Sequence, residues 1–167
     1  TARGPAAPAP VIPPARGIAT PSLTVIDKPG ATQTFIIAGK VLPAAPRADS
    51  VDATAAWAAN EVYGGNSTAR IASNLRADKG WTYGIGSGLY DTRGERRWIL
   101  AGSVERDHSG DSVAELIREM RGLTADRPPQ QAELDRIASA AANQNAAKLE
   151  GEADIVTAMA DAQRSEE

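Results

Sequence analysis

Apolar and polar residues alternate in three stretches of the chain, and this pattern predicts three strands of a sheet. The stretches are residues 32–41, 81–90 and 97–106. The first contains the apolar run Phe35, Ile36 and Ile37, so we expect it to be a central strand. The short segment between the other two is typical of a hairpin loop, with Gly94 in a strained backbone conformation.

Five other stretches repeat apolar residues every three to four positions, which is the spacing of one face of a helix. They begin near Val51, Ile71, Val113, Leu134 and Ile155. Asp49 or Ser50 suits the N-cap of the first predicted helix, and Asn66 or Ser67 suits the N-cap of the second.

The third predicted helix has the clearest apolar stripe. The stripe consists of Val113, Leu116, Ile117 and Met120. Ser112 and Glu115 have the spacing of a capping box immediately ahead of it, although Ser109 offers an earlier start. We expect Leu116 and Ile117 to belong to the core.

The order of these elements is strand, helix, helix, strand, strand, helix, helix. This order predicts an α+β fold, with a largely antiparallel sheet and helices packed on one face. Residues 1–21 are rich in Pro and Ala without a period, which is typical of a linker or arm. We therefore expect one domain in residues 22–167, a length that suffices for one core.

The composition excludes several classes of function. The net charge is −3, which does not favour binding to nucleic acid or to an anionic membrane. No apolar run approaches the length of a membrane span. The chain has no cysteine, which is compatible with cytoplasm and periplasm alike, and His108 is its single histidine. One imidazole cannot supply a two-histidine zinc site, so we expect no metal in this chain.

The remaining chemistry centres on a predicted helix-turn-strand between Gly64 and Tyr83. Arg76 falls in the last turn of the helix, and Gly80 suits the left-handed position after its end. Tyr83 follows a few residues into the strand. Because the chain reverses between Arg76 and Tyr83, both side chains can reach one surface, where they could hold a peptide carbonyl or a carboxylate.

Two motifs of this region resemble the non-catalytic half of M16 zinc peptidases, which are similar to pitrilysin and the mitochondrial processing peptidase. They are the segments 64–67 (GGNS) and 74–83 (NLRADKGWTY). The segment 26–34 is similar to the strand-opening part of the same half, and the similarity extends to about residue 150. The resemblance implies the metallohydrolase half fold, apparently truncated, since nothing after Met159 has the pattern of the closing strand.

The resemblance also implies a function. Arg76 and Tyr83 match, in their seven-residue spacing, an auxiliary catalytic pair that positions a peptide or an unfolded protein substrate. Gly84 and Gly86 are expected to let the substrate approach. Zinc is expected in a partner catalytic half, from the same longer polypeptide or a second subunit, because the His-x-x-Glu-His motif is absent here.

Other readings of the same residues stay open at this point. A nucleotide loop at 84–88 is disfavoured, since these glycines lie in a strand that leads to another strand. The glycines at 64–65 could precede an anion site, but the P-loop ending is missing. Arg76 could pair with Asp78 or Glu61, and Tyr83 could only pack at the surface. The whole chain could be a non-proteolytic M16-like structural subunit, or an unrelated helix-rich adaptor.

Overall fold

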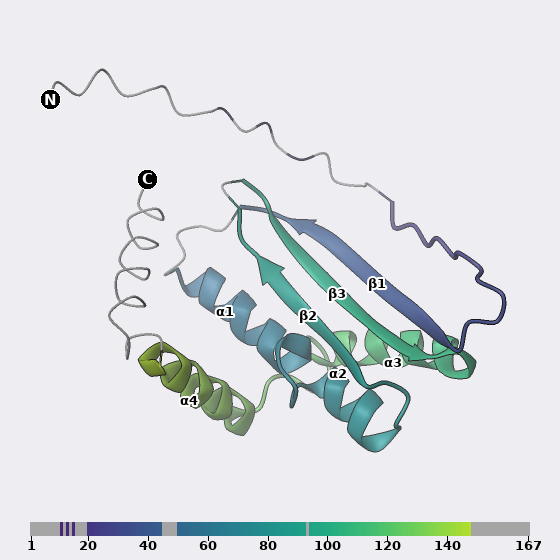
Figure 1. Ribbon diagram of the computed structural model, residues 1–167. Helices are drawn as coiled ribbons and strands as arrows, with labels where there is room; N and C mark the ends of the chain where they lie inside the picture. The colour runs from purple at the N-terminus through teal and green to yellow at the C-terminus, as the bar shows by residue number, and fades with distance from the viewer. Residues whose placement is uncertain are drawn as a thin grey trace, which may run out of the picture. The chain divides into compact units, whose positions relative to one another are not determined.

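The sheet of the protein has three antiparallel strands (Figure 1). The structure, a computed structural model, describes residues 11, 13, 15, 20–44, 50–92 and 94–147. The strands are β1 (Gln33–Leu42), β2 (Gly84–Tyr90) and β3 (Arg96–Glu105), in the order β1-β3-β2. The α+β prediction is confirmed. The expectation that the first strand is central is wrong for this sheet, because β3 pairs on both sides.

One face of the sheet carries the helices of the first compact unit, Thr1–Arg121. Residues of β3 alternate between the two faces, and Leu100 and Val104 are buried on the helix-covered side. Trp98 lies on the same side and donates its indole N–H to Asn60 Oδ1 at 3.2 Å. Ile99 and Ala101 alternate with these residues and therefore lie on the other face.

The first helix begins as predicted. Ser50 caps α1 (Val51–Asn60), since its Oγ accepts a hydrogen bond from the Ala53 N–H at 3.2 Å. A π-helical turn, η1 (Glu61–Gly65), continues α1 to the Gly64–Gly65 pair.

The second helix has two parts and starts later than predicted. They are α2 (Arg70–Ala72) and the π-helical segment η2 (Ser73–Asp78). Asn66 does not cap this helix, because its Oδ1 accepts from the N–H and the hydroxyl of Thr68. Nor does Ser67, since the N-cap is Ala69, which makes no side-chain bond.

The third helix, α3 (Ser109–Gly122), starts at the earlier of the two predicted sites. A short 3-10 turn, η3 (Arg106–His108), leads into it. The buried side of α3 consists of Ser112, Leu116 and Glu119. Ile117 and Met120 are 46% and 37% exposed, so the predicted core stripe is wrong except for Leu116. The helix is rotated about its axis because Glu119 is hydrogen-bonded to Asn74 of η2.

Two glycine predictions have different outcomes. Gly80 has a φ of 69° and takes the left-handed position after η2, as expected. The backbone angle of Gly94 depends on residue 93, which lies outside the described residues, so its predicted strain stays a prediction. β2 begins at Gly84, three residues after the predicted start at Trp81. Trp81 and Thr82 are also bonded to β3, but through the Trp81 carbonyl and the Thr82 side-chain hydroxyl, which are not part of the regular strand pairing.

The second compact unit comprises Gly122–Glu167 and is described by itself. It contains α4 (Gln131–Ala147), which confirms the helix predicted around Leu134. The predicted helix near Ile155 and most of the predicted arm at 1–21 lie outside the described residues. Among the described helices, none combines the length and the apolarity that a membrane crossing requires.

Candidate functional site

The turn between η2 and β2 has a defined conformation. The Trp81 N–H donates to the Leu75 carbonyl at 2.9 Å and closes the end of the helix. The Thr82 hydroxyl donates to the Ser103 carbonyl at 2.5 Å and accepts from the Gly84 N–H at 3.0 Å. These bonds fix where β2 starts, and with it the backbone of Tyr83.

Arg76 and Tyr83 lie at the two ends of this turn and are both exposed. The Tyr83 side chain is 90% exposed. Neither residue makes a hydrogen bond or an ion pair within the described part of the chain. In particular, Arg76 is not paired with Glu61, whose Oε2 accepts from Asn66 Nδ2 at 3.1 Å. Both side chains are therefore available to a ligand.

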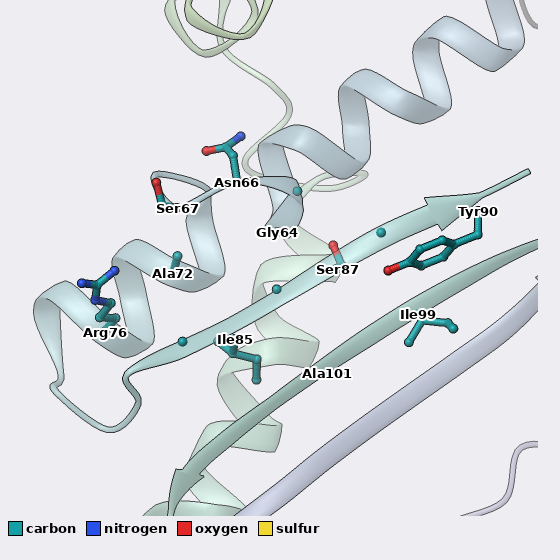
Figure 2. Close-up of a pocket in the computed structure, with 14 residues that line it drawn as sticks. Gly64, Asn66, Ser67, Ala72, Arg76, Ile85, Ser87, Tyr90, Ile99 and Ala101 are labelled. Atoms are coloured by element: carbon teal, nitrogen blue, oxygen red, sulfur yellow. The ribbon is translucent and has the colours of Figure 1, made fainter. Parts of the chain in front are cut away.

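A cleft of about 380 Å³ lies beside the start of β2, within the first unit (Figure 2). One wall is formed by the loop after η1 together with α2 and η2, and the other by β2 and β3. Arg76, Gly84 and Gly86 line the cleft, whereas Tyr83 does not. The remaining lining residues are Gly64, Gly65, Asn66, Ser67, Ala72, Ile85, Ser87, Gly88, Tyr90, Ile99 and Ala101.

Two groups of glycines contribute to the walls of the cleft, one at 64–65 and one in β2. A Cβ at Gly64 would lie 2.6 Å from Ile71 Cδ1 and 2.7 Å from Ser87 Oγ, so η1 packs closely on its neighbours only without a side chain there. Gly84 and Gly86 lie within a strand that is followed by another strand. This position does not fit the strand-to-helix geometry of a dinucleotide site.

Behind the cleft, η2 is attached to α3 by a cluster of polar side chains that we call the polar seam: Asn74, Lys79, Glu115 and Glu119. The Asn74 amide donates to Glu115 Oε2 and to Glu119 Oε1, at 2.7 Å each. Lys79 Nζ donates to Asn74 Oδ1 at 2.5 Å. The bond from Asn74 is the main reason that the pKa of Glu115 is lowered from 4.5.

Comparison with known protein families gives one match that covers most of the sequence. The family described as "Peptidase M16 inactive domain" matches residues 3–141. The chain belongs to this family.

Solved structures with the same fold support the assignment of the fold. The M16 inactive domain from Pseudomonas fluorescens superposes with a TM-score of 0.64 and 22% identity, over 76% of this chain and 29% of that one. A protease from Helicobacter pylori gives 0.64 and 20%, over 84% of this chain and 33% of its own. This M16 inactive domain thus spans about a third of these longer chains. No curated protein sequence matches it.

The polar seam of the M16 inactive domain extends to a buried tyrosine. Tyr63 donates its hydroxyl to the Leu116 carbonyl at 3.0 Å. Burial, and secondly the charge of Glu119, raise the pKa of this hydroxyl. Sequence reasoning missed Asn74 and Glu119. The available signal was the row Ser112, Leu116, Glu119, which has helical spacing but mixes polar and apolar residues.

The single histidine has a structural environment. The His108 ring stacks on Trp81 with 4.4 Å between centroids. Its Nε2 lies 3.9 Å from Glu105 Oε2, and its Nδ1 lies 3.8 Å from Asp111 Oδ2. In residues 20–44, 50–92 and 94–147, no three His, Asp or Glu side chains are grouped so that they could hold a metal ion. These residues do not fit the ligand set of a catalytic zinc.

Proposed function

We propose that this M16 inactive domain is the substrate-binding half of a zinc peptidase, with the zinc held by a partner catalytic half. The observation that carries the proposal is the pair Arg76 and Tyr83. Both flank one turn, both are exposed, and neither makes a hydrogen bond or an ion pair with another described residue. A polar side chain on an ordered turn gains nothing for the fold by remaining unpaired, but it is available to a ligand.

The two side chains would perform different tasks. The Arg76 guanidinium is planar and can donate two parallel hydrogen bonds to a carboxylate or to successive carbonyls. The Tyr83 hydroxyl can donate one bond to the carbonyl oxygen of the peptide that is cleaved. A donor that meets the developing oxyanion more strongly than the ground-state carbonyl lowers the barrier by about 3 kcal/mol. The partner's zinc would supply the activated water for hydrolysis.

The first test is complementation. Hydrolysis of an internally quenched peptide is measured for the chain alone, for an M16 half that carries His-x-x-Glu-His, and for their mixture. We expect only the mixture to cleave at the full rate. We also expect elemental analysis of the dialysed chain to find no stoichiometric zinc. Chelator-sensitive cleavage by this chain alone, or a full rate without it, would contradict the proposal.

Arg76→Lys provides a second test in the same mixture. Lysine keeps the positive charge but loses the planar arrangement of donors, so a bidentate contact is weakened. We expect a lower kcat/KM and an unchanged melting temperature, because Arg76 is exposed and makes no hydrogen bond or ion pair within the described part of the chain. If Arg76→Lys cleaves like the wild type, the planar guanidinium has no specific role in holding the substrate.

A further inference from the structure

A smaller pocket lies at the far end of β2, where this strand leads into the hairpin to β3. Its volume is about 260 Å³, and it lies between α1 and the hairpin, which are neighbours in the first unit (Figure 1). We call it the hairpin pocket. It shares no lining residue with the cleft beside Arg76. Its lining consists of Ala53, Thr54, Trp57, Leu89, Asp91 and Arg96.

Arg96 supplies the positive charge of the hairpin pocket. Its side chain is only 11% exposed. The Arg96 Nε–H donates to the Pro43 carbonyl at 3.3 Å, which orients the guanidinium. The guanidinium makes no other hydrogen bond within the described residues, so its terminal N–H groups can serve an acceptor in the pocket. An oriented guanidinium binds a carboxylate through two parallel hydrogen bonds.

Asp91 supplies the negative charge. Its Oδ1 lies 4.0 Å from Arg96 Nε, which is close enough for attraction between charges but too long for a hydrogen bond. The Asp91 side chain is 68% exposed, and an exposed ion pair of this kind contributes little to stability. The two charges thus lie side by side without a direct bond, and a ligand that carries both charges can pair with each of them.

Trp57 and Leu89 supply apolar surface between the helix and the strand. Trp57 is 39% exposed, and its indole N–H makes no hydrogen bond with another described residue. The indole of Trp98, the strand partner of Leu89, is in contrast bonded to Asn60. The residues that precede Trp57 by one helical turn are a threonine and an alanine, whose short side chains leave space beside the ring.

We propose that the hairpin pocket binds a free α-amino acid with an apolar side chain. The carboxylate of the ligand pairs with Arg96 and its ammonium group pairs with Asp91, while its side chain packs against Trp57. A free amino acid carries both charges on one carbon atom, as the neighbouring charges of the pocket require, whereas a peptide carries them at opposite ends. The pocket is smaller than the range of about 300–1,000 Å³ that is typical of drug-sized ligands. The inference is independent of the proposed function.

Titration of the full chain with L-phenylalanine tests the inference. The readout is the indole N–H signals of the three tryptophans in proton–nitrogen NMR spectra, in which Trp57→Phe identifies the signal of Trp57. We expect this signal to shift saturably, with a Kd of about 1 mM. The signal of Trp81, which precedes the start of β2, should stay in place.

Two analogues of the probe test the need for both charges. N-acetyl-L-phenylalanine lacks the ammonium group, and L-phenylalaninamide lacks the carboxylate. We expect each of them to bind about tenfold more weakly than L-phenylalanine, or less tightly still.

Substitutions of the charged residues supply the matched comparison. Asp91→Asn and Arg96→Gln remove one charge each, and each should weaken binding of L-phenylalanine about tenfold. Asp91 is exposed, so we expect Asp91→Asn to keep the melting temperature of the wild type. Arg97→Gln is the control, because the Arg97 side chain is exposed on the opposite face of β3, where its guanidinium lies 5.1 Å from the centre of the Tyr90 ring. It should bind like the wild type.

Three results would overturn the inference. The first is no shift of the Trp57 signal up to about 50 mM L-phenylalanine. The second is equal affinity for either analogue, which would mean that a single charge is recognised. The third is wild-type affinity in Asp91→Asn. None of these results bears on cleavage in the complementation assay, because the hairpin pocket and the cleft share no residue.

Discussion

The two sides of η2 differ in how their polar groups are used. On the side of α3, Asn74 makes three hydrogen bonds within the polar seam. On the side of the cleft, Arg76, two residues later, makes none within the described residues. Buried polar groups are costly unless they are paired, whereas exposed ones can remain free for a ligand. The same short helix is therefore anchored on one side and available for binding on the other.

The largest expected effect on stability lies on the anchored side. Leu116 is 6% exposed, and Leu116→Ala should lower the free energy of unfolding by about 2–5 kcal/mol through the cavity that it leaves. Ile117→Ala is the control, since Ile117 is 46% exposed and should cost less than about 1 kcal/mol. Denaturant titration measures both. Equal losses would contradict the orientation of α3 in which Leu116 is buried and Ile117 is exposed.

Asn74 provides the next comparison. Asn74→Ala removes the hydrogen bond that the Asn74 amide donates to the buried Glu119 and should cost about 1.5–3 kcal/mol, the value of hydrogen bonds to charged groups. Arg76→Ala, on the other side of the same helix, should change the free energy of unfolding by less than about 0.5 kcal/mol. A loss in Arg76→Ala as large as in Asn74→Ala would remove the distinction between the two sides.

A smaller effect concerns pH. The hydrogen bond from Asn74 lowers the pKa of Glu115 from 4.5, so the folded protein binds this proton less readily than the unfolded chain. The resulting stabilisation is present above pH 4.5 and is lost as the pH falls through the folded-state pKa. The difference in unfolding free energy between wild type and Glu115→Gln should therefore shrink from about pH 7 to about pH 3. A difference in unfolding free energy that does not change with pH would contradict the role of the polar seam in stabilising the ionised Glu115.

Much of this organisation could be predicted from the sequence. Periodicity located all three strands and the described helices, because apolar residues recur at the spacing of one face of a regular element. It placed Leu116 correctly but not Ile117, because the rotation of α3 is set by the bond between Glu119 and Asn74, forty-five residues apart. A periodic pattern contains no information on such a partner.

The candidate site was predictable to a similar extent. The glycine at position 80 and the strand after it placed Arg76 and Tyr83 at the two ends of one turn. The sequence could not show that Arg76 lines a cleft while Tyr83 lies outside it, since this depends on the packing of η2 against β2. Nor could it distinguish Gly84, which the fold does not need, from Gly102, which it does.

Two tyrosines offer the most direct test of the central claim, that an unpaired side chain on the turn serves the substrate. Tyr63 is buried and its hydroxyl is bonded to the Leu116 carbonyl, whereas the Tyr83 hydroxyl has no partner in the described chain. The measurement is kcat and KM of the reconstituted enzyme, beside a melting curve, for Tyr83→Phe and Tyr63→Phe.

In Tyr83→Phe we expect kcat to fall by about one to three orders of magnitude, with little change in KM and an unchanged melting temperature. In Tyr63→Phe we expect a lower melting temperature and an unchanged kcat. Wild-type kcat in Tyr83→Phe, or a collapse of its melting temperature, would contradict the account.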